Sequence, residues 1–350
     1  MAKAKKTQLP KDFETLLETQ DLTALQRLFD VYDVNARGSV FKQTALAFHN
    51  CPDDLARWLV VQGADLNAPD AYGDTPLHAR ARHWKGAVDV LIELGADLHN
   101  GEGAGGAPLH AAAGAFNAAN AAALLRHGAR VDALDRAGHT PLAYALQRCS
   151  NAQIERMAAL AEVLLSAGAR KTPEMAAAVA RIGADFEFHR AGFNPNTVDA
   201  ASAALDRLYA LFSVAPAPRR RTHDGVSPIV AKEAPWPDQH LELWQWLVPS
   251  SGHARTVQGE VIRISGRIHD ELEGNGGVNW DGDYKRMADA LLTHFAFGAP
   301  LEPSLLAEAR RIVADVKRKG GDARRLCELA VRWVALNPAP HALAKPDYER

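Results

Sequence analysis

Apolar residues recur at intervals of three and four along most of this chain, the spacing that places them on one side of an α-helix. Residues 13–29, 88–92 and 197–214 show this pattern, and so do several segments between residues 239 and 336. Short stretches rich in glycine, proline and polar residues separate these segments. The pattern therefore predicts an all-α fold built from many helices.

Residues 63–78 show how one helix ends and the next begins. Gly63 can adopt the left-handed conformation that ends a helix, and Thr75 can accept hydrogen bonds from the free amides at a helix start. Pro76 suits the first helical position. Between these residues there is room for a tight hairpin with its tip at 70–73, so we expect the order helix, hairpin, helix.

The same junction occurs several times. The helix-opening segments are 31, 32 and 33 residues apart and begin at Thr44, Thr75, Ala107 and Thr140. The helix-ending glycines are 32, 33 and 40 residues apart and lie at Gly63, Gly95, Gly128 and Gly168. One unit of this size cannot bury its own apolar face, so the units are expected to stack. The longer last interval places extra residues near 149–157, which would lengthen a helix or bulge a loop.

Two motifs of these units resemble the ankyrin repeat, whose period is about 33 residues. They are Thr-Pro-Leu-His at 75–78, with Ala-Pro-Leu-His at 107–110, and Gly-Ala-Asp at 63–65 and 95–97. The resemblance covers about residues 39–170 and implies a solenoid whose units each hold a hairpin turn and two helices. It also implies that His78 and His110 serve the hydrogen bonding of neighbouring turns rather than a metal site.

The remaining segments complete the predicted domain organisation. We expect an N-terminal helical cap at 1–38, repeats at 39–190 with a degenerate last repeat, and a capping helix at 191–214. Prolines make 215–238 a linker or an extended strap. Residues 239–336 carry helical stripes without the repeat motif and predict a small helical bundle domain of no family that we recognise, followed by a tail at 337–350.

Net charge argues against nucleic acid as a partner, and the lack of a long apolar segment argues against a membrane. Lys and Arg number 40 against 42 Asp and Glu, so no overall field draws the protein to nucleic acid. The basic triplet at 219–221 is interpreted as part of a solvated link, and nucleic-acid binding through it ranks last. No segment approaches the about 20 consecutive apolar residues of a membrane-spanning helix, so we expect no membrane partner.

The number and spacing of the cysteines indicate whether the protein resides in a reducing or an oxidising compartment. Cys51, Cys149 and Cys327 are odd in number and widely scattered, which argues against a disulfide framework and against a zinc module. This usage favours a reducing compartment, and we expect a cytoplasmic protein without metal or cofactor.

One polar cluster offers catalytic chemistry, and its members are His269, Glu271, Glu273, Asp281 and Asp283. His269 and Glu273 are one helical turn apart and could share a metal or act as an acid and base, with an aspartate from the following loop. The spacing matches no metalloprotease, calcium-loop or phosphate-binding motif. The alternative is a solvated helix end, a glycine-rich turn and an aspartate that caps the helix near Tyr284. We expect no catalytic residue here and keep a helical enzyme, targeted by the repeats, as the competing function.

The resemblance implies recognition of a partner protein through hairpin tips and the inner face of the first helices. Tyr and Arg often concentrate the binding energy of interfaces. The candidate contact residues are Asp70, Tyr72, Arg80, Arg82, Phe116, Asn117, Asp135, Arg136, Tyr144 and Arg148. We therefore expect a non-enzymatic protein-interaction module for an unidentified protein partner, such as a bacterial adaptor or an immunity protein that neutralises a toxin.

Overall fold

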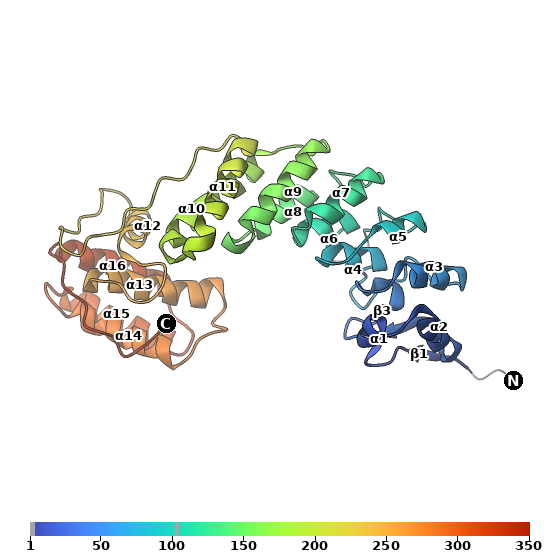
Figure 1. Ribbon diagram of the computed structural model, residues 1–350. Helices are drawn as coiled ribbons and strands as arrows, with labels where there is room; N and C mark the ends of the chain where they lie inside the picture. The colour runs from blue at the N-terminus through green and yellow to red at the C-terminus, as the bar shows by residue number, and fades with distance from the viewer. Residues whose placement is uncertain (1–3, 102–104) are drawn as a thin grey trace. The chain divides into compact units, whose positions relative to one another are not determined.

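The structure is a computed structural model that describes residues 4–101 and 105–350 of the chain (Figure 1). The chain forms two compact units. The first unit holds the residues up to 186 together with 194–217, and the second unit holds 187–193 together with 218–350. Most of the described residues are helical, as the apolar pattern predicts.

The first unit begins with the two predicted cap helices, α1 (Phe13–Thr19) and α2 (Leu22–Val31). The expectation of an all-α fold is incomplete, because a small sheet joins them. Its strands are β1 (Lys6–Gln8), β2 (Tyr32–Gly38) and β3 (Gln43–Thr44), with β2 parallel to β1 and antiparallel to β3. In β2 only Ala36 is fully buried, so the strand carries too little apolar alternation to stand out in the sequence.

Pairs of helices follow along the chain (Figure 1). The pairs are η1 (Ala45–Ala47) with α3 (Asp53–Val61), α4 (Pro76–Arg82) with α5 (Asp89–Glu93), α6 (Pro108–Gly114) with α7 (Ala118–Arg126), α8 (Pro141–Arg148) with α9 (Ile154–Ser166), and α10 (Pro173–His189) with α11 (Pro195–Phe212). The first helices of successive pairs pack on one another, as α4 does on α6 and α6 on α8. The second helices form their own row, in which α9 contacts both α7 and α11. Each pair therefore buries its apolar side against its neighbours.

The predicted junctions take the expected conformations. The four helix-ending glycines, at 63, 95, 128 and 168, have φ angles between 93° and 96°, the left-handed region that favours glycine. His78 lies at the start of α4, where its Nδ1 accepts a hydrogen bond from the Thr75 amide and its Nε2 donates to the Gly106 carbonyl over 2.8 Å. His110 Nε2 donates in the same way to the His139 carbonyl. The histidines link one turn to the next, as the motif predicts.

The extra residues near 149–157 lengthen a helix. The short 3₁₀ helix η2 (Asn151–Gln153) starts at Ser150, whose amide donates to the Gln153 side chain, and it leads directly into α9. With 13 residues, α9 is four residues longer than α7, which has nine. The insertion thus extends the row of second helices.

The second unit is the predicted helical bundle. Its helices are α12 (Trp236–Leu247), α13 (Val257–His269), the π-helical turn η4 (Asp270–Gly274), α14 (Gly282–Phe295), α15 (Pro303–Val316) and α16 (Ala323–Leu336). The central helix α13 is buried along most of its length and packs against α12, α14 and α16. Gly259 and Gly266 lie where an added Cβ would collide with Ala254 and with Trp244, so both admit close neighbours as expected.

Two extended segments complete the bundle. Part of the predicted linker packs on it, since Ile229 is buried in the core and its amide donates to the Pro338 carbonyl over 2.7 Å. The predicted tail is also packed, because Tyr348 is buried and its hydroxyl donates to Glu260. Segment 218–235 is therefore an extended strap rather than a free linker, and 337–350 is a second strap.

Candidate functional site

The first unit contains a groove that includes three of the predicted contact residues. We call it the hairpin groove. Its volume is about 380 Å³, and it is lined by Glu14, Ser39, Phe41, Gln43, Ala47, Phe48, His49, Asp70, Tyr72, Asp74, Ala79, Arg82 and His83. It lies between the turn at 39–43, the hairpin tip at 70–74 and the helix α4.

The hairpin tip holds its aromatic residue outward. The Asp70 carboxylate accepts hydrogen bonds from the amides of Tyr72 and Asp74, over 2.7 and 3.1 Å. Asp70 therefore shapes the turn, while the Tyr72 side chain stays 65% exposed. The Phe41 ring lies 6.1 Å from that of Tyr72 and is 47% exposed. Two adjacent hairpins thus present one exposed aromatic pair.

The charges of the hairpin groove are predominantly negative. Arg82 forms a 2.6 Å ion pair with Asp74, which is itself buried. The second oxygen of Asp74, Oδ1, is buried without a hydrogen-bond partner in the described part of the chain. Glu14 and Asp70 add two further carboxylates, so the lining residues carry three acids and one guanidinium. This excess of negative charge favours a positively charged group of a ligand.

Two histidines stack along the same groove. The rings of His49 and His83 lie 3.7 Å apart at an angle of 21°. Burial, and then the charge of His49, lower the pKa of His83. The Lys85 amide donates to Nδ1 of His83, which places the His83 proton on Nε2. Sequence reasoning did not select this pair.

The expectation that Arg80 is available to a partner is wrong. Its side chain is 1% exposed, and its guanidinium donates to the carbonyls of Leu46 over 2.8 Å and of Cys51 over 3.2 Å. Burial lowers the pKa of Arg80. Both carbonyls belong to the preceding helix pair and its loop, so Arg80 joins two successive pairs.

Three other predicted contact residues serve the local structure. Phe116 is buried with a left-handed φ of 55°, and Asn117 caps α7 while its side chain donates to the His83 carbonyl. Asp135 accepts from the amides of Ala137 and His139 and shapes its hairpin tip as Asp70 does. The structure does not bring these residues into the hairpin groove.

The last three predicted residues lie farther along the array. The Tyr144 ring packs on Gly114, where an added Cβ would lie 2.6 Å from it, and the Arg148 guanidinium lies 5.3 Å from the ring centre. Arg136 is exposed at its hairpin tip. None of the three lines the hairpin groove.

Sequence reasoning missed the exposed aromatic residues Phe41 and Trp84. Trp84 is 74% exposed, and the Lys85 ammonium lies 4.7 Å from its ring centre. Both residues fall in loops that adjoin the motif positions. A large aromatic side chain in such a loop was the available signal.

The second unit separates the five candidate catalytic residues. His269 Nδ1 lies 3.6 Å from Glu273 Oε2, as the spacing predicts. Glu271 is buried and accepts from Asn275 and Asn279, while Asp281 caps α14 and pairs with Arg350 over 2.7 Å. Asp283 pairs with Arg286. Glu271, Asp281 and Asp283 are therefore engaged elsewhere and do not give the convergence on His269 that the competing enzyme interpretation requires. Asp281 is the helix cap that the favoured interpretation predicts.

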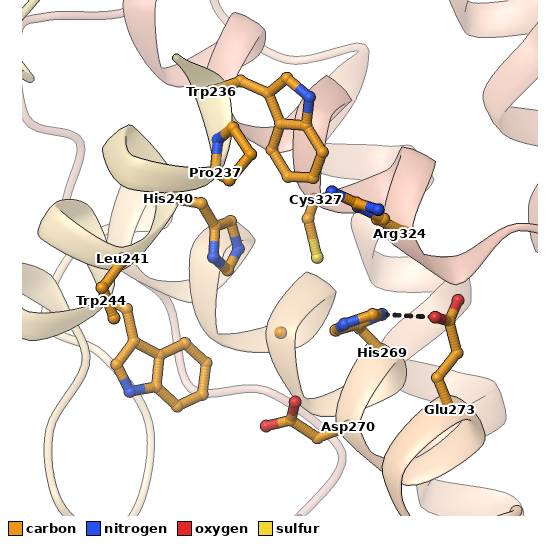
Figure 2. Close-up of a pocket in the computed structure, with 11 residues that line it drawn as sticks. Trp236, Pro237, His240, Leu241, Trp244, His269, Asp270, Glu273, Arg324 and Cys327 are labelled. Carbon is orange, nitrogen blue, oxygen red and sulfur yellow. Dashed lines mark ion pairs between the residues drawn. The ribbon is translucent and has the colours of Figure 1, made fainter. Parts of the chain in front are cut away.

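His269 and Glu273 instead line a separate cleft of about 580 Å³ (Figure 2). We call it the indole cleft. Its walls come from α12, α13, η4 and α16, and they consist of Trp236, Pro237, His240, Leu241, Trp244, Gly266, His269, Asp270, Glu273, Arg324 and Cys327. Its volume lies within the about 300–1,000 Å³ typical of ligand pockets.

Burial sets the protonation states inside the indole cleft. It lowers the pKa of His240 to about 4, with a smaller effect from the charge of His269, and it raises the pKa of the Cys327 thiol to about 12. The thiol is protonated and the His240 imidazole is neutral near pH 7, so the two do not form a thiolate and imidazolium pair. Among the described residues, no group of three His, Cys, Asp or Glu side chains is arranged to hold a metal ion.

The burial of His240 predicts a pH dependence of stability. Its pKa is about 4 in the folded protein against 6.5 in the unfolded chain, so the unfolded chain binds more protons between these values. Stability therefore falls as the pH drops, and we expect a loss of about 2 kcal/mol from this group between pH 7.5 and 5. Urea unfolding at the two pH values should show a smaller loss, by about this amount, for His240→Gln, whose amide can still donate to Ser265. Equal losses in the two proteins would contradict a buried neutral imidazole.

The basic triplet at 219–221 is partly used inside the second unit. Arg220 donates to the carbonyls of Gln245 and Phe188, over 2.6 and 3.1 Å, and its guanidinium lies 4.0 Å from the Phe188 ring centre. Burial lowers its pKa. Arg220 therefore anchors the first strap to the rest of the second unit.

The comparisons with known proteins found no match: no protein-family model and no curated protein sequence matches this chain. Within the described part of the chain, no helix combines the length and the apolar content needed to cross a lipid bilayer.

Proposed function

We propose that the chain is a non-enzymatic ankyrin-repeat protein that binds a partner protein through the hairpin groove. The stacked helix pairs, the left-handed glycines and the histidine links between turns support the family. A cytoplasmic location is part of the proposal, because Cys51, Cys149 and Cys327 are all free and buried, as suits a reducing compartment. An adaptor and a toxin-immunity protein would both use such a groove.

The observation that carries the proposal is the exposed aromatic pair of Phe41 and Tyr72 beside an acidic groove. Exposed aromatic side chains held by a rigid turn have little conformational entropy to lose on binding, and Tyr is enriched among residues that dominate interface energy. The carboxylates of Glu14 and Asp70 in the groove lining supply negative charge for a basic group of the partner. A polypeptide segment with an apolar side chain next to Lys or Arg fits this arrangement.

The test is the affinity of the intact chain for its captured protein partner. Tyr72→Ala is expected to weaken binding at least tenfold, about 1.4 kcal/mol, because the aromatic pair loses its most exposed member. Glu14→Gln removes one negative charge from the groove rim and is expected to weaken binding about threefold at low salt, and less at high salt.

A matched control distinguishes the groove from the rest of the array. Val61 is 81% exposed at the end of α3, outside the groove, so Val61→Ala should leave the affinity unchanged. Equal binding by wild type and Tyr72→Ala, or equal weakening by Tyr72→Ala and Val61→Ala, would refute the proposed surface.

A further inference from the structure

The indole cleft combines apolar walls with a polar end. Figure 2 shows the six-membered rings of Trp236 and Trp244 turned toward the middle of the cleft and their indole nitrogens turned away from it. The Trp244 ring lies directly over Gly266, where an added Cβ would approach Cζ3 to 2.5 Å. The absence of a side chain at Gly266 therefore keeps this wall in place and the cleft open beside it.

The polar groups of the indole cleft are mostly acceptors. The Asp270 side chain is exposed and has no hydrogen-bond or ion-pair partner among the residues that the structure describes, and Glu273 lies against the ring of His269. His240 Nε2 lies 3.1 Å from Ser265 Oγ, which itself donates to the Ile262 carbonyl. Ser265 must therefore accept the His240 Nε2 proton, which leaves His240 Nδ1 as an acceptor.

The charges of the cleft lining also favour a positively charged ligand. Among the described residues that line the cleft, Asp270 and Glu273 carry two negative charges and Arg324 is the only Lys or Arg. Arg324 lies 5.5 Å from the ring centre of Trp236 and shows that this wall accommodates a cation. Counted without the histidines, the lining residues carry a net charge of −1.

The backbone that carries Asp270 is unusual. Helix α13 ends at His269 and continues as the π-helical turn Asp270–Gly274 rather than as an α-helix. Such turns are rare and are frequently found at functional sites. Here the π-helical turn lies at the polar end of the cleft, with Asp270 and Glu273 both on the lining.

We propose that the indole cleft binds a small organic cation, a primary ammonium or guanidinium group on an apolar body, with the cation at Asp270 and Glu273 and the apolar body between Trp236, Leu241 and Trp244. The cation pairs with the exposed carboxylates of Asp270 and Glu273, and the apolar body covers the half-buried indole rings. A free amine and a lysine side chain of a polypeptide share this chemistry. The site is independent of the hairpin groove.

The test uses the full chain and phenethylamine as the probe, measured by calorimetry and by ligand-observed NMR. Its N-acetyl derivative keeps the apolar body and lacks the charge, so it should bind at least tenfold more weakly. Asp270→Asn should weaken phenethylamine binding at least tenfold, whereas Asp238→Asn, which removes the same charge outside the cleft lining on α12, should leave binding unchanged. Arg324→Gln removes the resident cation and should tighten binding about threefold.

A second arm identifies the source of the cation. A short peptide with blocked ends and one lysine should bind more tightly than phenethylamine if the cleft recognises a polypeptide. It should bind more weakly if the cleft recognises a free amine. Either result supports binding of an organic cation. Absence of binding by both probes overturns the proposal. It is also overturned if phenethylamine and its N-acetyl derivative bind equally, or if Asp270→Asn and Asp238→Asn behave alike.

Discussion

Replacing Arg80 with methionine is expected to lower the free energy of unfolding of the first unit by about 3 kcal/mol. The methionine fills a similar volume but cannot donate to the carbonyls of Leu46 and Cys51, which Arg80 satisfies inside the stack. Each hydrogen bond to a charged group contributes about 1.5–3 kcal/mol, and relief from burying the guanidinium offsets part of the loss. Urea unfolding followed by circular dichroism measures the difference.

Arg57 provides the control for this prediction. It lies on α3, its side chain is 48% exposed, and its ion pair with Glu93 on α5, which is 49% exposed, also joins two successive helix pairs. Arg57→Met should cost much less than Arg80→Met, because an ion pair exposed on both sides contributes little. If both variants lose the same stability, the buried linkage through Arg80 is not what joins the helix pairs.

Replacing Glu260 with glutamine is expected to destabilise the second unit by about 3–5 kcal/mol, because it leaves a buried Arg263 without its anionic partner. The two side chains lie on α13, are almost fully buried, and pair through two hydrogen bonds of 2.6 and 2.9 Å. Glu260 also accepts from the Tyr348 hydroxyl, so the change weakens the attachment of the second strap.

The double variant Glu260→Leu with Arg263→Met distinguishes this explanation from a general effect of substitution in α13. Removing both charges together should recover at least half of the stability lost by Glu260→Gln, since no buried charge remains unpaired. Thermal unfolding of the three proteins gives the comparison. A double variant that is less stable than Glu260→Gln would show that the pair does not act as a buried charge couple.

The junctions were predictable because their chemistry is local. Gly63 ends a helix because glycine adopts the left-handed conformation without strain. The adjacent residues Thr75 and Pro76 begin the next helix. The five helices of the bundle were predictable for a similar reason, because each carries its apolar stripe within 12 to 14 residues.

The burial of Arg80 was not predictable, because the groups that satisfy it lie far away in sequence. The Leu46 carbonyl is 34 residues from it, and nothing near Arg80 marks the residue as internal. The pairing of Asp281 with Arg350 spans 69 residues and is hidden for the same reason. Sequence spacing places a charged residue on a helix face, but the packing of the next pair decides whether that face is exposed.

The candidate site was predictable in part. The hairpin geometry marked Asp70 and Tyr72, because the turn that exposes them is encoded within a few residues. Phe41 was missed because it belongs to the preceding hairpin and meets Tyr72 only after the pairs stack. Of the indole cleft, the sequence marked only His269 and Glu273, because the other walls come from α12 and α16, which are separated from them by long segments of chain.

Site-specific photo-crosslinking shows whether the hairpin groove contacts the partner protein. A photo-reactive phenylalanine analogue is placed at position 72, in the hairpin groove, or at position 61, which is more exposed and lies at the end of α3. Each protein is irradiated with its bound partner. We expect position 72 to cross-link to one segment of the partner that contains Lys or Arg beside an apolar residue, and position 61 not to cross-link. A bound partner that cross-links at position 61 and not at position 72 would contradict this expectation.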